Sequence, residues 1–207
     1  MGGPEKPGPG KVPQDIQNSN NLVAAFNGGF QQKDGNYGMI ANNTIYLPLK
    51  QTLATLVMYK DKKPELIKYT GQKLDGDIAA IRQNCPMLIE DSQIVASSSA
   101  WNMQTWGLTT TNNMYTWRSG LGVTQEGDIV YASGPSLIPE TLAKALLAAG
   151  SVNAMQLDIN PFWVRFALFN PLGKGEYRYE PLEPNMVNGG YEYLHGYQKD
   201  FFYMYKK

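Results

Sequence analysis

The apolar run Leu22–Phe26 stops abruptly at Asn27–Gly29, and this stretch constrains the fold more than any other part of the chain. A short apolar run bounded by turn residues is typical of a buried strand. Glycine accepts positive φ and lets a ligand approach bare backbone. A second apolar run, residues 154–157, is followed by Asp158. We expect both strands to end at one cleft at the same end of a single sheet. The alternative is an ordinary turn after each strand.

Composition indicates a globular domain without a polyanionic partner. The chain has 207 residues, of which 43% are hydrophobic and 17% charged, and its formal net charge is zero. Because mixed and all-β domains reach about 200–250 residues, this length fits one domain. Balanced charge gives no surface for nucleic acid, so we expect no nucleic-acid partner. No apolar run approaches about 18 residues, so we also expect no membrane span.

The N-terminal residues 1–13 are rich in glycine and proline and contain no apolar core of a signal peptide. Such a segment buries little surface and is expected to be extended, either hanging free or covering the body of the protein. We therefore predict an N-terminal arm, residues 1–20, and a single domain, residues 21–207.

The sequence predicts strands for most of the chain. Apolar runs bounded by turn residues predict two hairpins, further strands and a final strand, with residues 171–199 as loop-like. The hairpins are expected at 55–59 with 65–69 and at 121–124 with 129–132, and the other strands at 78–82, 87–89, 154–157, 162–169 and 201–205.

One convincing helix is expected at about residues 139–149. Pro139 suits a first helical turn, and Gly150 suits a helix exit. Leu142, Leu146 and Leu147 form an apolar stripe that can dock on a sheet. The predicted fold class is therefore α+β, with a mixed, mostly β-sheet core and this one main helix packed on it.

The scarcity of histidine and cysteine excludes several chemistries. The only histidine, His195, lies in a loop-like stretch and is expected to be a surface or packing residue. The only cysteine, Cys85, precedes an apolar strand and is expected to be a buried, inert thiol. Serine or cysteine triads need a histidine base, and zinc sites need three or four nitrogen or sulfur ligands. Carboxylate, amide and guanidinium chemistry remains, which suits acetal or phosphodiester substrates.

Three segments in order resemble the phosphodiester glycosidase family. They are 25–30, which reads Ala-Phe-Asn-Gly-Gly-Phe, 117–123, which reads Trp-Arg-Ser-Gly-Leu-Gly-Val, and 154–158, which ends on Asp158 and follows the predicted helix. The resemblance covers residues 22 to 169. It implies a hydrolase-like domain that acts on a sugar-1-phosphodiester or a related glycan of the cell envelope, and hence an extracellular or envelope location with the export signal absent from this chain.

The resemblance also implies a set of site residues. Asp158 would serve the anomeric centre, Arg118 would hold the phosphate, and Asn27 would hold hydroxyl or phosphate oxygens. The substrate-binding residues would be Gly28, Gly29, Phe30, Arg82, Gly120 and Asn160. We predict no cofactor. Asp158 and Asn160 offer two oxygen ligands suited to Ca²⁺ or Mg²⁺; two fall short of a full site, and a divalent cation near Asp158 stays an open alternative.

Two departures from the family pattern support an alternative. The family's Asp-Gly-Gly motif is replaced by Asp158-Ile159-Asn160, and only about twenty residues precede the Asn-Gly-Gly-Phe element. Missing early strands would leave a sheet edge open, and an open edge invites pairing with another copy. The alternative is a non-catalytic extracellular module that binds glycans or assembles with itself. The partner is expected to be a carbohydrate or sugar phosphate, with a homo-oligomer through the uncovered edge.

Overall fold

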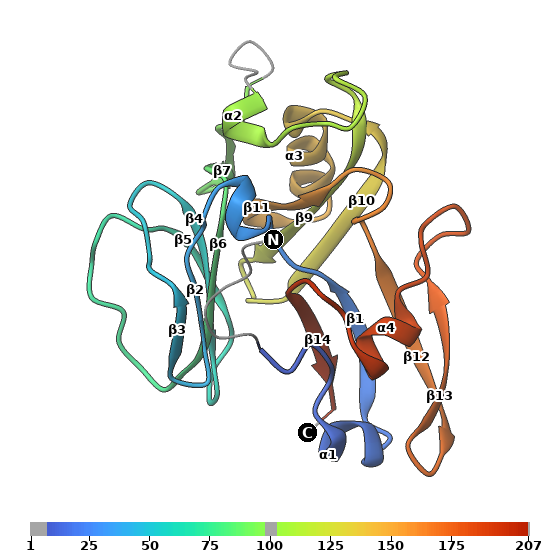
Figure 1. The fold of residues 1–207 in the computed structure, drawn as a ribbon. Coiled ribbons are helices and arrows are strands. Elements are labelled where there is room, and N and C mark those ends of the chain that lie inside the picture. The colour runs from blue at the N-terminus through green and yellow to red at the C-terminus, as the bar shows by residue number, and fades with distance from the viewer. Residues whose placement is uncertain (1–7, 98–102, 207) are drawn as a thin grey trace. The chain divides into compact units, whose positions relative to one another are not determined.

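The structure is a computed structural model that describes residues 8–97 and 103–206 (Figure 1). The chain folds into two compact units. Unit 1 contains residues 29–160, and unit 2 contains residues 7–28 and 161–207 within the described ranges. The architecture is mostly β-sheet with few helices, which confirms the predicted α+β class with its sheet-dominated core.

Unit 1 contains two five-stranded sheets. The first has the order β3-β2-β6-β4-β5, and the second has the order β10-β9-β11-β7-β8. Both are antiparallel throughout. The elements of unit 1 are η1 Gln32–Asp34, β2 Met39–Ala41, β3 Thr44–Leu47, β4 Ala54–Tyr59, β5 Glu65–Lys68, β6 Ile78–Asn84, β7 Met87–Glu90, β8 Gln93–Ile94, α2 Met103–Trp106, β9 Thr116–Thr124, β10 Ile129–Leu137, α3 Pro139–Ala148 and β11 Ser151–Ile159.

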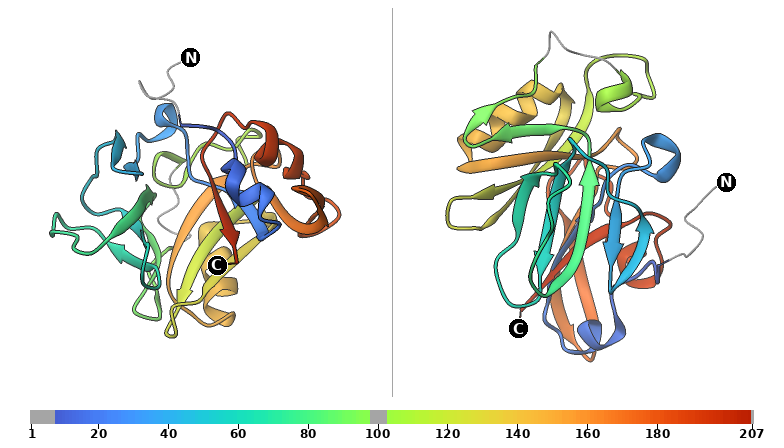
Figure 2. Two further views of the ribbon diagram at one scale, coloured as in Figure 1. Left: turned by 90° about the horizontal axis from the view of Figure 1, so that it is seen from below. Right: turned by 90° about the vertical axis from the view of Figure 1, so that its left-hand side faces the viewer.

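Helix α3 forms where the sequence predicts it. Its first turn is closed by Thr141, whose hydroxyl accepts from the Ile138 N–H and donates to the Ile138 carbonyl, both at 2.9 Å. Leu142 and Leu146 are fully buried in the core of unit 1, as the predicted stripe requires, whereas Leu147 is only partly buried and packs against that core. Figure 2 shows the helix lying along the second sheet. It docks closely because a Cβ at Gly120 on β9 would lie 2.9 Å from Leu146 Cδ1.

Unit 2 is built on a four-stranded antiparallel sheet with the order β13-β12-β1-β14. One face of this sheet packs against α4 and the N-terminal segment through an apolar cluster. The elements of unit 2 are α1 Gln14–Asn18, β1 Leu22–Asn27, β12 Phe166–Gly173, β13 Glu176–Pro181, α4 Gly190–His195 and β14 Phe201–Tyr205.

The described part of the N-terminal arm packs on α4. The Val12 N–H donates to the Tyr193 carbonyl at 2.9 Å, and the Gln17 side-chain amide donates to the carbonyls of Val12 and Leu194. The side of β1 away from β12 is paired with β14 instead. The arm therefore covers a helix of unit 2, while the C-terminal strand completes the sheet.

Two sequence predictions for unit 2 are wrong. The sequence predicts a strand at 162–169, but β12 begins at Phe166, and Arg165 Nε instead donates to the Phe162 carbonyl in a turn. The sequence also predicts a loop-like region at 171–199, but this region contains β13 and α4. Strand β13 alternates charged residues with Tyr177 and Tyr179, which pack on Phe169, and this period of two is the available sequence signal.

Candidate active site

Asp158 lies near the end of β11 and is only 5% exposed. Its carboxylate accepts a hydrogen bond from the Ile159 N–H at 2.9 Å, and its backbone carbonyl accepts from the Ser119 hydroxyl at 2.8 Å. The carboxylate also lies close enough to Tyr131 that its charge, together with burial as the larger cause, raises the pKa of that phenol. The candidate acid group is thus held in a nearly closed environment with two hydroxyl-bearing neighbours.

An irregularity in β11 decides which face of the sheet Asp158 occupies. Pairing with β9 is regular up to Gln156, which lies opposite Gly120, and then shifts so that Ile159 lies opposite Arg118. Ile159 belongs to the core beneath α3. The extra residue of such a bulge turns the preceding side chain to the other face. Asp158 therefore lies on the Ser119 face, whereas Arg118 lies on the α3 face.

Arg118 is completely buried and bonded to its own protein. Nε donates to the Leu137 carbonyl at 3.0 Å, Nη1 to the Trp106 carbonyl at 3.2 Å and to Gln156 Oε1 at 2.7 Å, and Nη2 to the Met114 carbonyl at 3.4 Å. Burial lowers the pKa of the guanidinium to about 10. The guanidinium fork predicted to hold phosphate thus joins strand β9 to α2, to the loop before β9, to the end of β10 and to β11.

Around Arg118 lies a buried polar cluster that sequence reasoning did not identify. Gln156 donates to the Trp106 carbonyl at 3.0 Å and to Cys85 Sγ at 3.5 Å, and the Cys85 thiol donates to the Tyr37 hydroxyl at 3.9 Å. Cys85 is fully buried, as predicted, and burial raises its pKa to about 12. Gln156 lies two positions before Asp158, and the only sequence signal for it is a polar residue inside an apolar run.

Gly29 and Phe30 are held by polar side chains from β6. Arg82 Nη2 donates to the Phe30 carbonyl at 2.8 Å, and Asn84 Oδ1 accepts from the Phe30 N–H at 3.2 Å. A Cβ at Gly29 would lie 3.0 Å from both side chains, so glycine permits the close approach. The Asn84 amide also donates to the Gln156 carbonyl at 2.8 Å. Asn84, which the sequence analysis missed, therefore joins this loop to the strand that carries Asp158.

Asn160 has a backbone φ of +74° and anchors the loop that precedes β9. Its side-chain oxygen accepts from the Thr110 N–H at 3.0 Å and from the Thr116 hydroxyl at 3.3 Å, and its amide donates to the Leu108 carbonyl at 3.2 Å. Asparagine tolerates positive φ better than most residues, so it can stand where the family pattern has glycine. These bonds already engage both side-chain polar atoms of Asn160. The predicted contact between Asn160 and substrate stays a prediction.

In unit 2, Asn27 is fixed by Arg165, the residue before β12, and by its own neighbour Gly28. Its side-chain oxygen accepts from the Arg165 N–H at 3.1 Å, and its amide donates to the Gly28 carbonyl at 3.0 Å. The Gly28 N–H donates to the Asp200 carbonyl at 3.0 Å, and a Cβ at Gly28 would overlap the Asp200 carboxylate. Glycine is thus required at this position by the packing of the chain itself.

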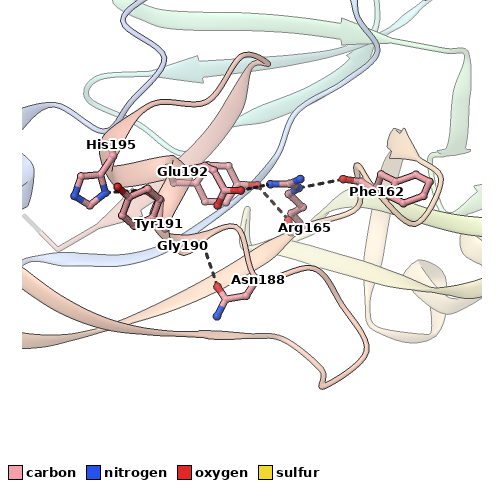
Figure 3. A network of polar contacts seen from close by, with 8 residues as sticks. Phe162, Arg165, Asn188, Gly190, Tyr191, Glu192 and His195 are labelled. Atoms are coloured by element: carbon pink, nitrogen blue, oxygen red, sulfur yellow. Dashed lines mark hydrogen bonds and ion pairs between the residues drawn. The ribbon is translucent and has the colours of Figure 1, made fainter.

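A polar network on α4 continues from Arg165 (Figure 3). The Arg165 guanidinium forms an ion pair with Glu192 at 3.0 Å and packs over the Tyr197 ring. His195 is exposed and stacks on Tyr191 with ring centroids 4.2 Å apart, as expected of a surface residue. The network ties the backbone that holds Asn27 to the short helix.

The structure places the predicted residues in separate sheets. Asn27 ends β1 in the sheet of unit 2, whereas Asp158 lies in β11 in the second sheet of unit 1. The expectation that both strand ends share one sheet is therefore wrong. Within unit 1 the structure places Arg118, Gly120 and Asp158 on the neighbouring strands β9 and β11, with Asp158 on the opposite face from Arg118 and Asn160 directly after β11. Gly29, Phe30 and Arg82 come together at β6. Gly120 on β9 serves as the close-packing position under α3.

The described residues hold neither a cluster of metal ligands nor a membrane-spanning helix. Within residues 8–97 and 103–206, no three His, Cys, Asp or Glu side chains gather as a group that could hold a metal ion. Over the same ranges, none of the helices has the length and hydropathy needed to cross a bilayer.

Comparison with known proteins decides the family. The model of the phosphodiester glycosidase family matches residues 20–158, which is more than half of the chain and ends on Asp158. The chain belongs to the phosphodiester glycosidase family. This match confirms the resemblance to the family that the order of the three sequence segments predicts. Among curated proteins, none matches the chain.

A solved structure shares the fold of this phosphodiester glycosidase family member. The zebrafish N-acetylglucosamine-1-phosphodiester alpha-N-acetylglucosaminidase catalytic domain, auto-inhibited by its pro-peptide, matches with a TM-score of 0.58 and 13% identity over 95% of this chain and 67% of that one. A hypothetical protein from Synechocystis matches with a TM-score of 0.39 and 14% identity over 81% of this chain and 50% of its own. The first match shows a shared fold.

Proposed function

We propose that this chain is a hydrolase that cleaves a sugar-1-phosphodiester, or a related glycan, outside the cell or in the cell envelope. The observation that carries the proposal is the family match, which runs through the Asn-Gly-Gly-Phe element and ends on Asp158. Removal of a sugar from a phosphodiester needs a group that can act on the anomeric carbon as acid, base or nucleophile. Asp158 is the carboxylate on which that match ends.

We assign Asp158 the role at the anomeric centre because of its surroundings. Its position beside Tyr131 and Ser119 gives it a polar but nearly closed environment, where a carboxylate interacts strongly with developing positive charge. Asn27, Gly28 and Gly29 remain the proposed contacts for substrate hydroxyl or phosphate oxygens.

The hydrogen bonds of Arg118 support a positioning role more than direct contact with phosphate. Its donors reach the Gln156 side chain on β11, two positions before Asp158, and the carbonyl of Leu137 at the end of β10, so these contacts fix β9 between its two neighbouring strands. The predicted phosphate contact would require those bonds to be exchanged. We therefore propose that Arg118 holds the strand that carries Asp158.

Substitution of Asp158 tests the enzyme hypothesis. Asp158→Asn keeps the side-chain shape but removes the charge and the proton acceptor, so turnover of a sugar-1-phosphodiester should fall by about 10²-fold or more while the melting temperature stays close to wild type. The assay measures release of reducing sugar from a panel of sugar-1-phosphodiesters. Asp128→Asn, on an exposed turn, is the matched control and should retain wild-type turnover.

A second candidate is the non-catalytic glycan-binding or self-assembling module. It is favoured by the buried cluster of Arg118, Gln156 and Cys85 and by the structural bonds of Asn160. Wild-type protein that turns over no member of the panel, combined with a lower melting temperature for Asp158→Asn, would favour this module over the enzyme. Binding of the same compounds, measured by calorimetry, would then distinguish glycan binding from self-assembly.

A further inference from the structure

Strand β14 is an edge strand made entirely of uncharged, mostly aromatic residues. It reads Phe201-Phe202-Tyr203-Met204-Tyr205, and in the described sheet it pairs on one side only, with β1. Tyr203, Met204 and Tyr205 are 37%, 40% and 43% exposed. Unpaired edges of this composition favour pairing with another strand.

The other edge of the same sheet is protected in the usual way. Strand β13 carries Glu176, Arg178 and Glu180, all exposed, and ends on Pro181. Charged residues and proline at an edge discourage intermolecular pairing. Of the two edge strands of this sheet, β14 is the one that carries neither a charged residue nor a proline.

The backbone of β14 shows which groups are available for pairing. The Asp200 carbonyl accepts from the Gly28 N–H at 3.0 Å, and the Lys206 N–H donates to the Asn21 carbonyl at 2.9 Å, so the even-numbered residues turn their backbone polar groups toward β1. These groups alternate in direction along a strand. The N–H and C=O groups of Phe201, Tyr203 and Tyr205 therefore point to the open side.

The side chains of β14 form two distinct rows. Ring centroids lie 6.4 Å apart for Phe201 and Tyr203 and 6.0 Å apart for Tyr203 and Tyr205, so these three rings form a row on one face. Phe202 and Met204 alternate with them and lie on the other face. The Phe202 ring packs on Phe26 at 5.4 Å.

We propose that β14 pairs antiparallel with β14 of a second copy of this chain, across a two-fold axis at Tyr203. In this register Tyr203 lies opposite its own equivalent and Phe201 lies opposite Tyr205, and each pair exchanges both of its outward N–H and C=O groups. The aromatic rows of the two copies become one continuous row. On the other face, Phe202 meets the Met204 of the second copy, a favourable sulfur–aromatic contact.

The occupant is a second copy because β14 is complementary to itself: this register pairs all three outward-facing residues, whereas a shift by two residues would pair only two of them within the strand. A shift by one residue would place the inward-facing groups of the even-numbered residues opposite the free groups of the other strand. The two-fold arrangement is also the commonest form of homodimer. The surface is small, below about 1,200 Å², so the association is weak and concentration-dependent. This inference does not depend on catalysis.

Sedimentation velocity over a range of protein concentrations tests the proposal. The wild-type chain should shift from monomer to dimer, whereas Tyr203→Lys should weaken the dimer at least tenfold by placing two like charges opposite each other. Tyr191→Lys is the matched control on α4, where the tyrosine is 58% exposed, and should dimerise as the wild type does. A wild-type chain that stays monomeric at several hundred micromolar, or a dimer unaffected by Tyr203→Lys, would overturn the proposal.

Cysteine cross-linking tests the register and serves as the second measurement if Tyr203→Lys fails to fold. Cys85 is buried, so an introduced cysteine is the accessible thiol. Tyr203→Cys would place two thiols on residues about 5.5 Å apart at Cα, within disulfide range. Met204→Cys would place them on diagonal neighbours about 7–8 Å apart, beyond that range. A covalent dimer should form with Tyr203→Cys and not with Met204→Cys; equal yields, or none with either variant, would contradict the pairing.

Discussion

Replacement of Arg118 by methionine should destabilise unit 1 by about 2–5 kcal/mol. Methionine fills much of the arginine volume but donates no hydrogen bond. Trp106 keeps a donor because Gln156 also bonds its carbonyl at 3.0 Å. The Leu137 carbonyl and Gln156 Oε1 lose donors at 3.0 and 2.7 Å, and a buried acceptor left unsatisfied costs about 1–3 kcal/mol. Relief from burying a charge offsets part of this loss.

Urea denaturation followed by tryptophan fluorescence measures the effect. A lower midpoint with an unchanged slope would report a true loss of stability. Arg178→Met is the matched control, because that side chain is 68% exposed, and should change the free energy of unfolding by less than about 0.5 kcal/mol. If Arg118→Met is as stable as this control, the hydrogen bonds described for Arg118 do not hold the second sheet together.

Three further predictions concern the same unit. Leu146→Ala should cost about 2–5 kcal/mol, because the side chain is fully buried between α3 and the sheet and its loss leaves a cavity; an unchanged denaturation midpoint would show that the helix is not docked. Asn160→Gly should cost about 1–2 kcal/mol through lost hydrogen bonds, and hydrogen exchange at the Thr110 N–H should accelerate, so retained protection there would contradict the anchoring role. Burial raises the pKa of Cys85 from 9.0 to about 12, so the folded chain keeps a proton that the unfolded chain releases between these values. Its contribution to stability is complete below pH 9 and declines by up to about 1.4 kcal/mol per pH unit above it. Cys85→Ala should remove that slope, and identical pH profiles for both proteins would refute the assignment.

Local patterns were enough to predict much of the fold. The run before Asn27 is β1, the proline start and leucine stripe are α3, and the apolar residues 201–205 are β14. Each of these depends on interactions within a few residues: turn residues at strand ends, caps and a period of 3.6. The order of motifs was likewise enough to identify the family, because it is a property of the sequence.

Tertiary structure alone decided how the candidate site is built. The shift in register after Gln156 places Asp158 and Arg118 on opposite faces of one sheet. The sequence around residue 158 gives no signal that predicts this shift. The partners of Arg118 come from α2, from the loop before β9, from the end of β10 and from β11, so they follow from which segments pack together. Helix α4 has only six residues and is held by the burial of Tyr193 and Leu194. The periodicity of a strand or helix is set by residues close together in the sequence. Strand register and burial are set by residues that are distant in sequence and packed together in the fold, and the geometry of the candidate site depends on these long-range contacts.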